Sequence, residues 1–72
     1  MSKVKELRER NNEKQYEIAA LINNSHANYS KKENGSLKFN LKEAKIIAEH
    51  YGGSIENIFF ENEVSITEIG KS

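Results

Sequence analysis

The stretch KQYEIAALINNSHANYSKKENG, residues 14–35, decides the fold of this 72-residue chain. Its first half carries apolar residues at helical spacing, which predicts a short amphipathic helix. Asparagine tolerates a left-handed backbone, so Asn23 is suited to a hinge. Either Asn24 or Ser25 can then cap a second helix that ends near Glu33. Two short helices joined in this way are typical of a helix-turn-helix.

The segment before this stretch predicts one further helix. Val4 and Leu7 lie at helical spacing, which favours a helix over residues 3–11. Asn12 followed three residues later by Gln15 has the form of a capping box. We therefore expect Asn12 to cap the first helix of the helix-turn-helix.

Two more helices follow the stretch. Asn40 and Glu43 form a second capping box, and the apolar stripe after them predicts a helix that ends at Gly52 and Gly53. Ser54 then caps a last short helix. The stripe consists of Leu41, Ala44, Ile47, Ala48 and Tyr51.

The pattern changes beyond residue 60. Val64 and Ile66 alternate with polar residues, which fits either a dimerising strand or a mobile tail. We therefore place the domain at residues 1–60 and a C-terminal tail at residues 61–72.

Composition points to one small helical domain. A chain of 72 residues buries only about 60% of the surface that its unfolded form exposes. Hydrophobic residues make up 36% and charged residues 31%, as expected of an ordinary soluble domain. There is no cysteine, and no apolar run is long enough for a signal peptide or a membrane span. These features predict a cytoplasmic protein.

The overall charge is zero, but it is unevenly distributed. Residues 1–50 carry ten lysines and arginines against seven glutamates, whereas residues 51–72 carry one lysine against four glutamates. The two parts can face different partners or each other. An accidental difference between two solvated surfaces explains the charge distribution equally well.

The chemistry of an enzyme is missing from the sequence. No nucleophile and base, glycine-rich phosphate loop or carboxylate pair has a meaningful spacing. Two isolated histidines without cysteine do not predict a metal site. We therefore expect neither catalysis nor a cofactor.

A set of landmarks across residues 4–60 carries a family resemblance. They are Leu7, Arg8, Gln15, Ile18, Ala19, Ile22, Asn23, Ser30, Glu33, Asn34, Gly35, Leu41, Ile47, Ala48, Tyr51, Gly52, Ser54, Ile55, Ile58 and Phe59. Together they resemble the XRE/Cro/CI-like family of phage and bacterial regulators. The chain is also similar to the small modulator-of-repression proteins of temperate lactococcal phages, which share this fold and oppose a CI-type repressor.

The resemblance implies an all-α fold: a compact five-helix lambda-repressor-like domain with a short C-terminal tail, in which helices 2 and 3 form the helix-turn-helix. It also implies a partly buried ion pair between Arg8 and Glu33, and a core position for Tyr29. His50 is expected to be an ordinary surface residue near a helix end.

The same resemblance places the third helix in the major groove of DNA. Asn28 would bond to adenine, Lys31 to guanine or a phosphate, and His26 to a guanine or the backbone. Gln15 would bind a phosphate at the start of the second helix. The alternatives are that Ser25 and Asn28 only cap the helix and that His26 has no ligand. The candidate DNA-binding residues are Lys14, Gln15, Ser25, His26, Asn28, Lys31 and Lys38.

Several residues depart from the family pattern. Lys14 replaces a common threonine cap, Glu13 a common apolar residue, and Asn24 the usual valine of the turn. Lys32 stands where an aromatic or aliphatic residue often closes the third helix. Apolar side chains occupy positions that are generally polar or solvent-facing in the family, which favours a protein interface. The alternative is that they are singly exposed surface residues, which are normal in soluble proteins. These interface candidates are Leu21, Leu37, Phe39, Ile46 and Phe60.

Two functions follow from these features. The first is a phage regulator of the lysis-lysogeny switch, a Cro-like antirepressor that binds a CI-type repressor and, weakly or with assistance, operator DNA. The alternative is a stand-alone Cro-like repressor that binds DNA as a homodimer. The few cations near the third helix favour the first function, because phosphate contacts dominate DNA affinity. No membrane or small-molecule substrate is expected, and the site of action is the cytoplasm of the bacterial host.

Overall fold

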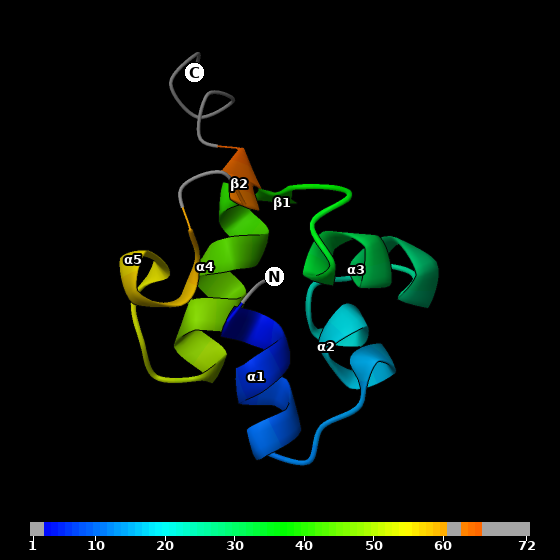
Figure 1. The fold of residues 1–72 in the computed structure, drawn as a ribbon, viewed down its shortest axis with the longest axis horizontal. Coiled ribbons are helices and arrows are strands. Elements are labelled where there is room, and N and C mark those ends of the chain that lie inside the picture. Colours follow the sequence, from blue (N-terminus) through cyan, green and yellow to red (C-terminus); the bar gives the residue numbers. More distant parts are fainter. Residues whose placement is uncertain (1–2, 61–62, 66–72) are drawn as a thin grey trace.

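A computed structural model describes residues 3–60 and 63–65 of the chain. Helix α4 lies centrally, with α5 to its left and the pair α2 and α3 to its right (Figure 1). The elements in chain order are α1 (Lys3–Arg10), α2 (Gln15–Leu21), α3 (His26–Glu33), β1 (Phe39–Asn40), α4 (Leu41–His50), α5 (Ile55–Ile58) and β2 (Val64–Ser65). The predicted all-α fold with five helices and a helix-turn-helix is confirmed.

The helix starts follow the capping chemistry of the sequence with one exception. The Ser25 hydroxyl accepts a hydrogen bond from the backbone N–H of Asn28, and Ser54 caps α5 in the same way. Asn40 and Glu43 form the expected capping box, each side chain accepting from the other residue's backbone N–H. The predicted starts of α3, α4 and α5 are therefore confirmed.

The exception is Asn12, which does not cap α2. Its φ of 57° puts it in the left-handed region, and its N–H donates to the Glu9 carbonyl, so it closes α1 instead. Lys14 occupies the N-cap of α2, and its backbone N–H donates to Glu17 Oε1 at 2.7 Å. Since a lysine side chain has no acceptor, α2 has only this half of a capping box.

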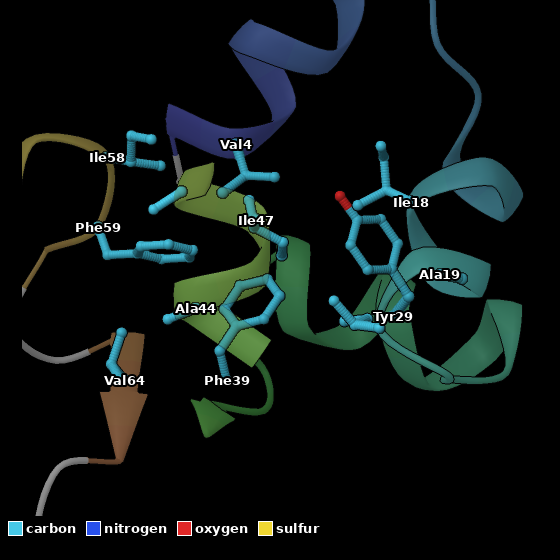
Figure 2. Packing of buried hydrophobic residues seen from close by; sticks show 12 residues of the cluster. Val4, Ile18, Ala19, Tyr29, Phe39, Ala44, Ile47, Ile58, Phe59 and Val64 are labelled. Atoms are coloured by element: carbon cyan, nitrogen blue, oxygen red, sulfur yellow. The ribbon is translucent and has the colours of Figure 1, made fainter. Parts of the chain in front are cut away.

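The core lies between α4 and the elements around it. Figure 2 shows Val4, Ile47 and Phe59 converging on the space that Phe39 fills. The buried apolar side chains are Val4, Ile18, Ala19, Ile22, Tyr29, Phe39, Ala44, Ile47, Ala48, Ile58, Phe59 and Val64. This cluster joins all five helices and both strands.

Phe39 was expected to face solvent as an interface candidate, and that expectation is wrong. Its side chain is 0% exposed. The ring packs edge to face against Tyr29 and Phe59, with ring centroids 6.2 Å and 5.1 Å away. Phe39 therefore joins the helix-turn-helix to α5.

Of the two alternatives for the segment around Val64, a dimerising strand or a mobile tail, the structure shows a strand, but it pairs within the chain. β2 runs parallel to β1, with Phe39 opposite Val64 and Asn40 opposite Ser65. Val64 is buried against the core. β2 thus lies beyond residue 60, where we placed the domain boundary, and Ile66 lies outside the described residues.

Candidate nucleic-acid interface

The helix-turn-helix is built on a tight turn between α2 and α3. Asn23 adopts the left-handed φ of 58° that the sequence predicts, and the Asn24 N–H donates to the Ala19 carbonyl at 2.8 Å. The turn places the first residue of α2 against the first residue of α3: His26 Nε2 lies 2.9 Å from Gln15 Oε1. Two predicted DNA-binding residues from different helices are thus in direct contact.

Most of the seven predicted DNA-binding residues lie at the surface. Gln15 is half-buried, whereas the remaining six are exposed: Lys14, Ser25, His26, Asn28, Lys31 and Lys38. The Ser25 side chain caps α3, as one sequence-based alternative held. Exposure leaves Asn28 and Lys31 free to reach a ligand.

Three buried residues and the half-buried Gln15 of α2 hold α3 against α1. We call Arg8, Gln15, Tyr29 and Glu33 the α1–α3 cluster. Arg8 forms a fork on the Glu33 carboxylate, with Nε at 2.8 Å and Nη2 at 3.1 Å. The Tyr29 hydroxyl donates to Glu33 Oε2 at 2.6 Å, and Gln15 Nε2 donates to Glu33 Oε1 at 2.9 Å. The predicted ion pair and the core position of Tyr29 are confirmed.

The charge state of the α1–α3 cluster is set by its contacts. Burial alone would raise the pKa of Glu33, but hydrogen bonds from Arg8, Tyr29 and Gln15 outweigh it and hold this pKa below the usual 4.5. The contact with Glu33 raises the pKa of Arg8, and burial raises that of Tyr29. Glu33 is therefore an ionised group that only accepts hydrogen bonds.

A second cluster holds α3 against α4, and of its contacts only the Asn40–Glu43 capping box was predicted from the sequence. We call Asn24, Lys32, Asn40 and Glu43 the α3–α4 cluster. Lys32 Nζ lies 2.8 Å from both carboxylate oxygens of Glu43. Asn24 Nδ2 donates to Glu43 Oε2 at 2.9 Å, while Asn24 Oδ1 is buried and has no hydrogen-bond partner among residues 3–60 and 63–65. Lys32 is thus engaged inside the domain, whereas its neighbour Lys31 faces solvent.

The polar residue Glu13, at a position that is commonly apolar in the family, also has partners. His50 Nε2 and the Tyr51 hydroxyl each lie 2.6 Å from a Glu13 carboxylate oxygen. Burial alone would raise the pKa of Glu13, but these two hydrogen bonds hold it below 4.5. Glu13 thus ties the end of α4 to the turn before α2.

A comparison with known families decides the assignment. A family model described as "Helix-turn-helix" matches residues 4–58, which is most of the chain. The chain belongs to the helix-turn-helix family. This supports the XRE/Cro-like resemblance and a DNA-binding transcription regulator. Searches of curated proteins and of solved structures found no match.

The exposed apolar residues of this helix-turn-helix protein differ in part from those predicted. Leu21, Leu37 and Phe60 are exposed as expected, Ile46 is half-buried, and Tyr16 is an exposed aromatic that the sequence analysis missed. The exposed fractions of Tyr16, Leu21, Leu37 and Phe60 run from 41% to 61%. Tyr16 falls outside the buried stripe of α2, a signal that was available in the sequence.

Neither a metal-binding group nor a membrane-spanning helix is present in the part of the chain that the structure describes. Within residues 3–60 and 63–65, there is no group of three or more histidine, cysteine, aspartate or glutamate side chains that could hold a metal ion. Over the same residues, no helix is long and apolar enough to cross a membrane.

Proposed function

We propose that this protein is a transcription regulator that places α3 in the major groove of operator DNA. The contact between Gln15 and His26 supports this, because it brings the first residues of α2 and α3 to one surface. Backbone N–H groups at a helix start favour a phosphate, and exposed polar side chains at the start of α3 suit base edges. Gln15 and Lys31 bind the phosphate backbone, and Asn28 contacts a base.

The charge of this surface limits its affinity for DNA. Lys14, Lys31 and Lys38 are exposed cations on or beside the helix-turn-helix, whereas Lys32 is paired with Glu43. Each phosphate contact contributes about −0.9 to the log-log salt slope, and six to ten contacts are typical of tight binders. Binding by a monomer is therefore weak, and a homodimer or an assisting protein is needed for operator occupancy.

A salt series on three variants tests the DNA contact. Gln15→Ala and Asn28→Ala are expected to weaken operator binding, and the effect of Asn28→Ala is expected at one base position. Asn57→Ala removes an exposed amide from α5, on the other side of α4, and is the matched control (Figure 1). Unchanged affinity in both test variants would rule out the proposed contact.

A second candidate function is capture of a CI-type repressor, which would make the protein an antirepressor in a phage lysis-lysogeny switch. Exposed apolar side chains favour it: Leu21 ends α2, and Leu37 follows α3. A partner that covers both residues lies across the helix-turn-helix and competes with DNA. This role places the protein in the cytoplasm of a bacterial host.

An experiment that mixes this protein with a CI-type repressor tests the antirepressor role. The repressor encoded beside this chain is mixed with it, and the complex is measured by analytical ultracentrifugation and by release of operator DNA. We expect a stoichiometric complex that Leu21→Ser and Leu37→Ser weaken, with Asn57→Ala, an exposed residue of α5, as the control. Absence of a complex at micromolar concentration would exclude this role.

A further inference from the structure

The α1–α3 cluster fixes the orientation of the Gln15 amide. Glu33 is ionised and already accepts from Arg8 and Tyr29, so it can only accept from Gln15 as well. The Gln15 atom 2.9 Å from Glu33 Oε1 is therefore the amide nitrogen. The amide oxygen consequently points to the other neighbour of Gln15, which is His26.

The Gln15 oxygen in turn fixes the tautomer of His26. An amide oxygen has lone pairs and no hydrogen, so His26 Nε2, at 2.9 Å, must carry the hydrogen of this bond. A neutral imidazole has one N–H, so its Nδ1 is then an acceptor. His26 is exposed, and within residues 3–60 and 63–65 no hydrogen bond to its Nδ1 is found.

We propose that this chain of hydrogen bonds, from Arg8 through Glu33 and Gln15, makes neutral His26 a specificity-determining residue that accepts from a base. In the major groove, the donors are the amino groups of adenine and cytosine, whereas the N7 and O6 atoms of guanine are acceptors. His26 therefore selects adenine or cytosine, in contrast to the guanine contact expected from the sequence. The inference rests on the proposed docking of α3.

The tautomer is measurable without DNA. Long-range proton–nitrogen NMR, at a pH where the imidazoles are neutral, distinguishes a hydrogen on Nε2 from one on Nδ1. His50 is an internal reference, because its Nε2 faces the ionised carboxylate of Glu13 at 2.6 Å. We expect hydrogen on Nε2 of both histidines in the wild type, and a mixture at His26 in Gln15→Ala. A hydrogen on Nδ1, or the same mixture in both proteins, would overturn the inference.

The base contact is tested on a duplex selected from random sequence. The adenine or cytosine at the selected position is replaced by an analogue that lacks the amino group. A lost hydrogen bond is expected to weaken wild-type binding roughly five- to tenfold and to leave binding by His26→Ala unchanged. The same replacement outside the bound site is the control.

The outcomes separate this inference from the proposed function. If the wild type binds both duplexes equally, the base contact by His26 is overturned while DNA binding stands. If it binds no duplex, both the proposed function and the base contact fail, and the NMR result still reports whether Gln15 sets the tautomer.

Discussion

The α1–α3 cluster and the α3–α4 cluster hold the same helix in different ways. Each is centred on a buried glutamate: Glu33 is 3% exposed and Glu43 is 7% exposed. Glu33 meets the planar fork of Arg8, which matches a carboxylate with two parallel hydrogen bonds. Glu43 meets the ammonium group of Lys32, which is a point charge with no such geometry.

The two clusters also differ in where they lead. The first continues through Gln15 to His26 at the start of α3, so it connects the core to the proposed DNA-binding surface. The second ends at Lys32 and Asn24, and it removes one cation from that surface. Two similar ion pairs can therefore support function differently, one by orienting a ligand-binding side chain and the other by holding a helix in place.

The largest expected effect comes from breaking the first cluster. Arg8→Met leaves Glu33 as a buried carboxylate without its counter-ion, which should cost about 3–5 kcal/mol of unfolding free energy. A chain of this size has a total of roughly 4–11 kcal/mol. Urea denaturation monitored by circular dichroism measures the loss.

The double variant Arg8→Met with Glu33→Gln is the control for this prediction. It removes both charges and keeps one acceptor oxygen, for either Tyr29 or Gln15, so it should recover part of the loss. A single variant that costs less than about 1 kcal/mol, or a double variant that is no better, would contradict a buried, uncompensated charge as the cause.

Breaking the second cluster should cost less. Lys32→Leu removes the cation, but Glu43 keeps hydrogen bonds from Asn24 Nδ2 and from the Asn40 backbone. We expect a loss of about 1–3 kcal/mol in the same denaturation experiment. Adding Glu43→Gln should restore most of it. A loss as large as that of Arg8→Met would mean that the two clusters are energetically equivalent.

Acid should weaken both clusters. Burial alone would raise the pKa of Glu43, but hydrogen bonds from Lys32, Asn40 and Asn24 hold it below 4.5, as Arg8, Tyr29 and Gln15 do for Glu33. A carboxyl group whose pKa is lower in the folded state than in the unfolded state stabilises the fold at pH values above its unfolded-state pKa. This contribution is lost as the pH falls through the folded pKa.

We therefore expect the unfolding free energy to decrease as the pH drops below 4.5, measured by denaturation over a pH series. Glu43→Gln should make the decrease shallower, and the Arg8→Met with Glu33→Gln double variant should do the same. An unchanged slope in both would show that other carboxylates account for the acid sensitivity.

The smallest expected effect is on the salt dependence of DNA binding. Lys31→Ala should make the log-log slope less steep by about 0.9, because it removes one phosphate contact. The double variant Lys32→Leu with Glu43→Gln keeps the net charge and should leave the slope unchanged. If Lys31→Ala has no effect and the double variant does, Lys32 is the DNA-binding cation and its pairing with Glu43 opens on binding.

Most of the fold could be predicted from the sequence because its signals are local. Ser25, Asn40 and Ser54 cap helices through residues three positions away, so capping needs no knowledge of the tertiary structure. Asn12 was mispredicted because asparagine suits both the start of one helix and the left-handed end of another. Here it ends α1.

The features that the sequence did not predict depend on distant partners. Phe39 is buried because it pairs with Val64 in the sheet and because its ring packs against Phe59. Neither contact can be predicted from the residues next to Phe39 in the sequence. The ion pair of Lys32 and Glu43 depends on how α3 crosses α4, which local periodicity does not specify. The Arg8 and Glu33 pair is equally distant and was predicted only through the family resemblance.

The parallel pairing of β1 and β2 has a consequence for synthesis on the ribosome. The helix-turn-helix is complete by residue 35, yet Phe39, which covers Tyr29, is enclosed by Phe59 and by the strand at Val64. A nascent chain that ends before residue 59 therefore exposes an aromatic surface beside its recognition helix. The regulator can adopt its native core only when the chain through Val64 has left the exit tunnel.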